Sequence, residues 1–431
     1  MINALGLLRQ RRFLPLFVTQ FLGAFNDNLF KTTMVLFATY EIFNDAKLES
    51  NFNALATGLS LIPFFLLSAL SGQLADTHDK SKIIRLVKTA EIAIMLFGGA
   101  GMLAARAGHT TIGIGMMLAS VLFLGIHSTF FGPIKYAILP QHLKEDEVLG
   151  GTGLVEAGTY LSILIGTVVA GFVVHDIRLA AGMTLAVALA GWVTGRMVPP
   201  APRVGPQLAI NYNPLTSSWR LISATMHIPR LFLAICAISF FWTIGAVLII
   251  IFPPLVKNVL TADERVASMT IAIFSIGVAI GSVIINAMLK GRISAKYGPM
   301  SVLLMAVFVV AFSLEARNFV PAPDGGLYNI AEFVTMPQSL LVIVTLVAIA
   351  ITGGMFVVPL YAFLTTTVTK DQTARTVAAN NVVNSGAMAV GAVVVIALTA
   401  LGVTSENMLL LVAVMCLISA WLAQKLHKAC D

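Results

Sequence analysis

Charged residues are scarce in this sequence: only 11% of its 431 residues are charged, whereas 58% are hydrophobic. A soluble domain usually has about 25% charged residues, so the composition excludes an ordinary soluble protein. Short alternating segments, which are typical of a transmembrane barrel, are also absent. Apolar runs of about 20 residues, long enough to cross a bilayer, instead recur along the whole chain. The composition therefore predicts an all-α membrane protein.

Cysteine is rare too, and motifs for catalysis are missing. Cys236, Cys416 and Cys430 show neither pairing nor zinc-ligand spacing. His142 is followed five positions later by Glu147, not by the Asp of an acyltransferase motif. There is no Gly-rich phosphate loop and no His/Cys metal spacing. We expect no enzyme activity, no cofactor and no metal.

The N-terminal segment MINALGLLRQRRF lacks a small-residue cleavage site, so we interpret the first apolar run as an uncleaved helix. Hydropathy predicts twelve transmembrane helices in all. They cover roughly 13–40, 54–75, 83–104, 111–131, 152–174, 179–198, 229–252, 266–288, 299–320, 338–364, 376–400 and 407–424. The longest polar connection contains Pro199, Pro200 and three further prolines, which argue against a continuous helix. We therefore predict an N-terminal six-helix bundle at 1–198, a cytoplasmic linker at 199–228 and a C-terminal six-helix bundle at 229–431.

The two halves share short sequence patterns. GPIKYAIL around Pro133 resembles VPLYAFL around Pro359, 226 positions later; LVEAG at Glu156 resembles VVNSG at Asn384, 228 positions later. The nearly equal offsets indicate two pseudo-symmetric six-helix bundles with parallel topology, the major facilitator fold. Chance similarity between apolar segments is the alternative.

The net charge of +7 does not indicate nucleic-acid binding, because the basic residues form short clusters between apolar runs. Twenty Lys and Arg residues, Lys88 among them, are assigned to one side of the membrane and six to the other; Lys31 lies within a span. This bias predicts that both termini and the linker are cytoplasmic.

The loop GQLADTHDKSK resembles the signature loop of the major facilitators. Gly72 would allow a close helix approach, and Asp76 would pair near Arg375 at the start of span eleven. With Lys80 facing the cytoplasm, these residues form a candidate conformational latch. An ordinary charged loop is the alternative.

The stretch FLGAFNDNLFK interrupts the first apolar run with polar residues. On a helix, Gln20, Asp27 and Lys31 share a face, with Asn28 beside them. A single Asp or Lys at a bilayer centre costs about 2.5–3.5 kcal/mol. Such residues therefore belong in a protein interior or a wet cavity. They form either a substrate or coupling-ion site, or an internal Asp27–Lys31 pair that locks the helix to a neighbour.

Further polar candidates lie in spans four, five and eleven. Glu156 and Tyr160 share a face, and Lys135 follows a helix-breaking Gly-Pro. Asn380 and Asn384 are one turn apart; amides there either bind substrate or join helices. From Ile235 to Phe252, span seven carries no charge, and Trp242 is one of its few polar side chains. An amphipathic substrate suits such a cavity, as does a hydrophobic cation.

Four segments together resemble the bacterial lysophospholipid transporter family of the major facilitator superfamily. They are AFNDNLFK around Asp27, FFGPIKYAILPQ around Lys135, GLVEAGTY around Glu156, and GGMFVVPLYAFL. The resemblance spans nearly the whole chain. It implies a flippase that moves lysophosphatidylethanolamine and related lipids from the outer to the inner leaflet of the bacterial inner membrane, where an acyltransferase/acyl-carrier synthetase restores the second chain.

The resemblance gives Asp27, Lys135 and Glu156 the places of the family's cavity charges. Members of this family carry an Arg in span seven after a Phe-Trp pair, but TIGAVLII after Phe241-Trp242 has none. Lys31 would supply that charge instead. We expect a monomer with membrane lipids and lysophospholipid as partners. A proton-coupled exporter of hydrophobic small molecules is the alternative function; head-group preference, coupling ion and direction stay open.

Overall fold

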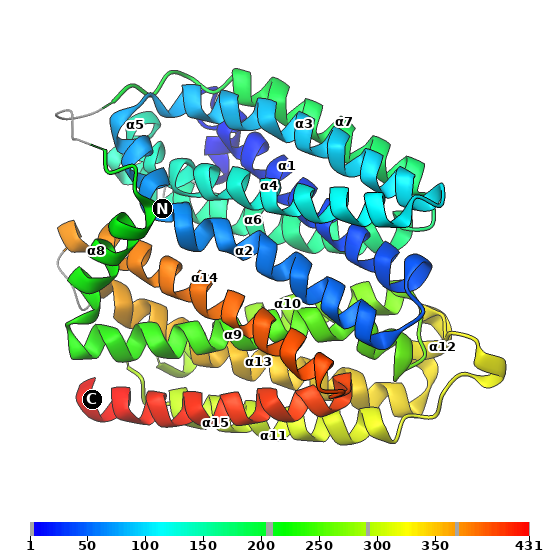
Figure 1. The fold of residues 1–431 in the computed structure, drawn as a ribbon. Coiled ribbons are helices and arrows are strands. Elements are labelled where there is room, and N and C mark those ends of the chain that lie inside the picture. The colour runs from blue at the N-terminus through cyan, green and yellow to red at the C-terminus, as the bar shows by residue number, and fades with distance from the viewer. Residues whose placement is uncertain (1–3, 204–209, 290–293, 367–369, 431) are drawn as a thin grey trace. The chain divides into compact units, whose positions relative to one another are not determined.

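A computed structural model describes residues 4–203, 210–289, 294–366 and 370–430, and Figure 1 shows its ribbon. The described residues are mostly helical, with a single isolated β-bridge between Ala262 and Tyr328. The long helices are α1 (Leu14–Phe37), α2 (Ala46–Thr77), α3 (Lys80–Arg106), α4 (Thr110–Ala137), α6 (Glu145–Val173), α7 (Ile177–Arg196), α9 (Pro229–Asn258), α10 (Glu264–Leu289), α11 (Gly298–Arg317), α13 (Pro337–Thr366), α14 (Lys370–Ala400) and α15 (Ser405–Cys430). The shorter ones are η1 (Ala4–Arg9), η2 (Ala38–Ile42), α5 (Leu139–His142), α8 (Pro214–Met226), η3 (Pro323–Gly325) and α12 (Ile330–Thr335). The predicted all-α class is confirmed.

Each predicted span overlaps one of the long helices, although the ends differ by up to eight residues, as at the start of α2. In the described part of the chain, ten helices are long and apolar enough to cross a membrane. Helices α1 and α6 are not among these ten, although Ala157–Val173 within α6 is a shorter apolar helix. The protein is thus a multi-pass membrane protein, and the count of twelve spans stays a prediction.

Contacts divide the chain into two compact units. The first comprises Met1–Phe37 and Leu66–Ser217, and the second comprises Ala38–Phe65 and Ser218–Asp431. Helix α2 therefore begins among the residues of the second unit and ends among those of the first. The domain limits expected at 198 and 229 stay a prediction.

The two units repeat the same pattern of helix pairing. In the first unit, α1 packs on α6 and α7, and α3 packs on α4 and α7. In the second, α9 packs on α14 and α15, and α11 packs on α13 and α15. The correspondence is clear when the twelve long helices are numbered from one to twelve along the chain. The pairs one–five, one–six, three–four and three–six of the first unit then recur, six numbers higher, as seven–eleven, seven–twelve, nine–ten and nine–twelve. This recurrence supports the predicted duplication of a six-helix unit.

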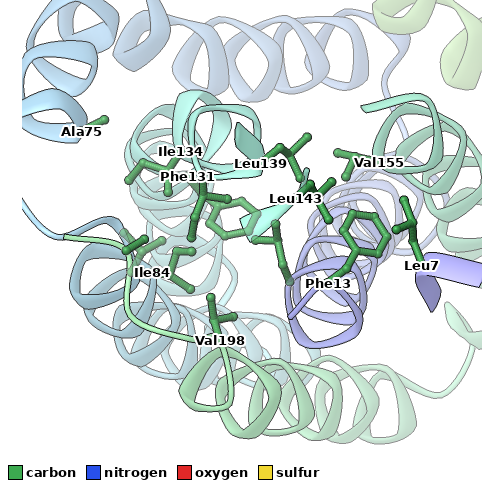
Figure 2. Packing of buried hydrophobic residues seen from close by; sticks show 14 residues of the cluster. Leu7, Phe13, Ala75, Ile84, Phe131, Ile134, Leu139, Leu143, Val155 and Val198 are labelled. Carbon is green, nitrogen blue, oxygen red and sulfur yellow. The ribbon is translucent and has the colours of Figure 1, made fainter. Parts of the chain in front are cut away.

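An apolar cluster lies within the first unit. Its buried members include Phe13 just before α1, Leu16 of α1, Ile84 of α3, Phe131 of α4, Leu139 of α5 and Val198 after α7 (Figure 2). Because α1, α3 and α4 all contribute to it, the cluster fixes the three helices that carry the polar residues described below.

Helix α3 begins at a capped turn that also ties two loops of the first unit together. Asp79, the N-cap, accepts hydrogen bonds from the backbone N–H of Ser81 at 2.9 Å and from that of Ala201 at 3.3 Å. In return, the Lys80 N–H donates to the Ala201 carbonyl at 3.0 Å. Burial raises the pKa of Asp79, but these hydrogen bonds outweigh it and hold the pKa below its ordinary value.

Asp79→Ala is expected to lower stability by about 0.5–2 kcal/mol near neutral pH, as loss of an N-cap usually does. Because the folded-state pKa is depressed, this contribution is full above the ordinary carboxyl pKa and is lost as pH falls through the folded-state value. The difference in thermal stability between wild type and variant, measured in detergent, should therefore shrink on acidification. Asp79→Asn, which caps without charge, should retain most of the stability and show little of this pH dependence.

In the second unit, glycines permit close packing of α10 on α13. A Cβ at Gly281 would overlap the Ile351 carbonyl oxygen, and a Cβ at Gly354 would overlap that of Val278. Gly277, one turn before Gly281, faces Ala350. Small residues spaced by four positions are the means by which membrane helices approach closely, since lipid supplies no hydrophobic force between them.

Gly281→Ala is expected to destabilise the protein by about 1–3 kcal/mol, because the added methyl group meets backbone that cannot move aside. Thermal inactivation in detergent measures the effect. Gly245→Ala is the matched control: Gly245 lies inside α9 and has nothing within 4 Å of its Cβ position among the described residues. The prediction is wrong if both variants inactivate at the wild-type temperature.

Candidate functional site

Three consecutive polar residues, Asn26, Asp27 and Asn28, form a polar turn in the middle of α1. The helix satisfies its own backbone groups, so only the side chains need partners in the membrane. The Ser128 hydroxyl of α4 donates to Asp27 Oδ2 at 2.6 Å. Asp27 Oδ1 is buried and has no hydrogen-bond partner in the part of the chain that the structure describes. The carboxylate is thus held through one oxygen, and the other oxygen has no partner among the described residues.

A buried ion pair lies beside this turn. Lys88 and Glu91, both on α3, are 2.6 Å apart with side chains 0% and 1% exposed. The other oxygen of Glu91 accepts a hydrogen bond from the Asn26 amide at 2.9 Å, and His127 Nε2 of α4 lies 3.3 Å from Glu91. The prediction that Lys88 is one of the cytoplasmic charges is wrong, because its side chain is buried within α3.

Glycines on two helices make room for the Lys88 side chain. A Cβ at Gly23 of α1 would lie 2.5 Å from Lys88 Nζ, and one at Gly195 of α7 would lie 3.3 Å from its Cγ. The ammonium group also lies 5.1 Å from the centre of the Phe131 ring, within the range of a cation–π interaction. Residues of α1, α4 and α7 thus contact the buried Lys88 side chain.

A second polar group joins α1, α4 and α6 toward the apolar cluster of Figure 2. The Thr159 hydroxyl donates to Gln20 Oε1 at 2.9 Å, and Lys135 Nζ donates to Thr159 Oγ1 at 3.1 Å. Lys135 also lies 5.0 Å from the Tyr136 ring centre. The predicted residues Gln20 and Lys135 are thus linked through the hydroxyl group of Thr159. Thr159 itself was not among the predicted site residues.

Other predicted residues of the first unit have diverse surroundings. The Asn28 amide donates to the Ala24 carbonyl of its own helix at 2.8 Å. Lys31 is half-buried and forms no ion pair with Asp27 within the described residues, and Tyr160 is 63% exposed. The Glu156 side chain lies outside the described residues.

The latch residues are described only in part, because the Asp76 and Arg375 side chains lie outside the described residues. Around Gly72, no described atom lies within 4 Å of the Cβ position. Lys80 is buried rather than facing outward. The latch therefore stays a prediction.

The second unit carries neutral polar pairs. Trp242 Nε1 of α9 donates to the Tyr361 hydroxyl of α13 at 2.7 Å. Ser239 of α9 donates to Asn384 Oδ1 of α14 at 2.6 Å. One turn away, Asn380 is fully buried and its amide has no hydrogen-bond partner among the described residues. At the predicted site positions, charged side chains therefore lie in the first unit, and those of the second unit are hydrogen-bonding groups without charge.

The second unit also contains a buried ion pair that the sequence analysis did not predict. Glu49, at the start of α2 and 0% exposed, accepts from Lys257 Nζ at 2.6 Å and from the Asn258 amide at 2.5 Å, both at the end of α9. Lys257 also donates to the carbonyls of Thr39 and Phe43. These bonds fix the connection between α1 and α2 to the end of α9.

These groups offer opposite charges to a ligand. In the described ranges, no group of three or more His, Cys, Asp or Glu side chains could hold a metal ion. A carboxylate with a free oxygen and a lysine bonded to a hydroxyl are suited to an ammonium and a phosphate, respectively.

Comparison with known proteins identifies the class. The model of the Major Facilitator Superfamily matches residues 16–331, so the chain belongs to this superfamily. Two solved structures have a TM-score of 0.68 and cover 97% of this chain: a bacterial homolog of the human lysosomal transporter Spinster, at 14% identity, and a bacterial homologue of the iron transporter ferroportin, at 11%. Both structures have the same fold as this chain, and the predicted major facilitator fold is thereby confirmed.

Some bacterial relatives are more similar in sequence than these two structures. The chain is 24% identical over 389 residues to the Lysophospholipid transporter LplT of Cronobacter sakazakii, with 88% of this chain and 85% of the relative covered. It is 26% identical over 372 residues to that of Salmonella typhimurium, with 81% and 78% covered. The resemblance inferred from the motifs is confirmed.

Proposed function

We propose that this protein is a lysophospholipid transporter of the bacterial inner membrane. It moves single-chain phospholipids such as lysophosphatidylethanolamine from the outer to the inner leaflet by alternating access. An acyltransferase/acyl-carrier synthetase then restores the second chain. Its relatives named as lysophospholipid transporters, which cover most of the chain, carry the proposal.

The polar groups of the first unit fit the head group of such a lipid. Asp27, with one oxygen free, faces the ammonium. Lys135, which donates to Thr159, holds the phosphate, and Lys31 is the second candidate for this role. The acyl chain needs only an apolar path.

Leaflet-resolved transport tests the proposal. The purified protein is inserted into liposomes, and lysophosphatidylethanolamine with a labelled acyl chain is added outside. The label should become inaccessible to extraction by albumin faster than in protein-free liposomes. The matched control is the diacyl lipid with the same head group and label, which should not move faster.

Two outcomes would overturn the proposal. One is an unchanged rate of lysolipid movement in liposomes shown to contain folded protein. The other is transport of a hydrophobic cation without transport of lysolipid, which would support the proton-coupled exporter instead.

A further inference from the structure

Helix α8 exposes apolar side chains and buries hydroxyl groups, the reverse of the arrangement expected for a helix in water. Leu215 and Trp219, four positions apart on one face, are 62% and 70% exposed, and Tyr212 just before the helix is 69% exposed. Ser217 and Ser218 are instead buried. A surface helix of a soluble protein turns its apolar face toward the core. The exposed face of α8 is therefore suited to an apolar environment.

The buried face of α8 is fixed by polar contacts with α2 and with the residue that precedes the helix. Gln73 of α2 accepts from the Asn211 N–H at 2.8 Å and donates to the Ser217 hydroxyl at 3.2 Å. The Ser217 hydroxyl in turn donates to the Asn211 carbonyl at 3.0 Å. These bonds determine which face of α8 is turned inward, so the exposure of Trp219 follows from the fold.

Helix α8 is too short to cross a membrane, and it does not continue into α9. Its 13 residues rise about 20 Å, whereas the hydrocarbon core of a bilayer is about 30 Å thick. Ile228 has an extended backbone and Pro229 begins α9, so the helix is interrupted between them. Helix α9 is long and apolar enough to span the membrane. We therefore expect α8 to lie at the membrane surface, on the side predicted to be cytoplasmic.

The charge of this segment suits an anionic surface. No Asp or Glu occurs from Pro199 to Arg230, whereas Arg203, Arg220 and Arg230 are all exposed. Arg220 directly follows Trp219, at the edge of the apolar face. Trp and Tyr are enriched where membranes meet water, and basic residues there attract the anionic lipids of the cytoplasmic leaflet. A membrane surface is favoured over a protein partner, because the start of α9 holds α8 close to it.

We propose that α8 is an interfacial helix that binds anionic phospholipids of the cytoplasmic leaflet. Leu215, Trp219 and Tyr212 insert beside the upper parts of the acyl chains, while Arg220 and Arg230 contact lipid phosphates. Helices that lie in a membrane surface have this arrangement, with an apolar face in the acyl boundary and basic residues beside it. The bound phospholipid belongs to the surrounding membrane and is not the transported lipid, so the inference does not depend on the proposed function.

Quenching of Trp219 fluorescence tests where the exposed face lies. The protein is placed in lipid nanodiscs, and the emission of Trp219→Phe is subtracted from that of the wild type to isolate the Trp219 signal. Phospholipids brominated near the start of their acyl chains should quench this signal. Aqueous iodide should quench it far less than it quenches free tryptophan amide, the reference for full access to water.

The opposite pattern would overturn the inference. If iodide quenches Trp219 as strongly as the free amide and the brominated lipids have no effect, the face is in water and available to a protein partner instead.

Lipid selectivity tests the role of the arginines. Brominated phosphatidylglycerol should quench Trp219 more than brominated phosphatidylcholine at equal content. The ratio of the two binding constants should fall about fivefold in Arg220→Gln, as expected for one arginine near a membrane surface. Arg178→Gln, which changes an exposed arginine at the start of α7, is the matched control and should keep the wild-type ratio.

Equal quenching of the wild type by the two lipids, or an unchanged ratio in Arg220→Gln, would overturn the binding of anionic lipid. None of these measurements contains lysolipid. A protein that shows the expected quenching but moves no lysolipid would therefore support this inference and overturn only the proposed function.

Discussion

Glu91→Leu is expected to destabilise the protein by about 3–5 kcal/mol, the largest effect on stability that we predict. The substitution leaves the Lys88 ammonium, 0% exposed, without the carboxylate 2.6 Å away, and removal of one partner strands a buried charge. It also removes the acceptor of the Asn26 amide, 2.9 Å away. Thermal inactivation and the yield of monodisperse protein in detergent measure the effect.

The double variant Lys88→Met/Glu91→Leu distinguishes the charge from the shape of this pair. Replacing a buried ion pair by apolar residues of similar volume is often neutral or stabilising. The double variant should therefore recover most of the stability lost in Glu91→Leu. The prediction is wrong if Glu91→Leu is as stable as wild type, or if the double variant is the least stable of the three proteins.

The helices could be predicted from the sequence because membrane insertion leaves a strong one-dimensional signal. Apolar runs locate the spans, and each predicted span overlaps a long helix, whereas the helix ends differ from the predicted ones by up to eight residues. The polar face of α1 also followed from helical periodicity: Asp27 does contact a neighbouring helix, through Ser128. Which side chain it would contact could not be predicted, because that depends on the rotation of α4 about its axis.

The sequence analysis missed the Lys88–Glu91 pair although a signal was present. Two opposite charges three residues apart, inside the span predicted at 83–104, indicate an internal ion pair, because intramembrane charges are rarely exposed to lipid. Counting Lys88 toward the cytoplasmic excess hid that signal. The contact of His127 with Glu91 could not be predicted, because it depends on how α3 and α4 face each other.

The Glu49–Lys257 pair carried no such signal. The two residues are 208 positions apart, and each lies near a helix end, where a lone charge is ordinary. Only the packing of the start of α2 within the second unit brings them together. Ion pairs across such distances are set by tertiary structure, which one sequence does not reveal.

Asp27→Asn is expected to reduce the transport of lysophosphatidylethanolamine about tenfold or more. A hydrogen bond to a charged group is worth about 1.5–3 kcal/mol, and 1.4 kcal/mol corresponds to a factor of ten. The amide keeps the size of the side chain and a hydrogen bond to Ser128, so the fold should be retained. Initial rates of leaflet-resolved transport, at equal amounts of folded protein, measure the change.

The same substitution at Asp176 is the matched control. Asp176 caps the exposed start of α7 and accepts from the Arg178 and Leu179 N–H groups, and asparagine caps a helix about as well as aspartate. Asp176→Asn should therefore transport lysolipid at the wild-type rate. A wild-type rate for Asp27→Asn would remove the Asp27 carboxylate from the mechanism.

Comparing two lipids with different head groups distinguishes between two roles for Asp27. If its carboxylate binds the ammonium, Asp27→Asn should impair lysophosphatidylethanolamine far more than lysophosphatidylglycerol, which has the phosphate but no ammonium. If Asp27 instead acts only through its hydrogen bond with Ser128, both lipids should slow by the same factor, because that bond does not depend on the head group. Initial rates for the two lipids, each divided by its wild-type rate, therefore separate a substrate-binding carboxylate from one with a structural role.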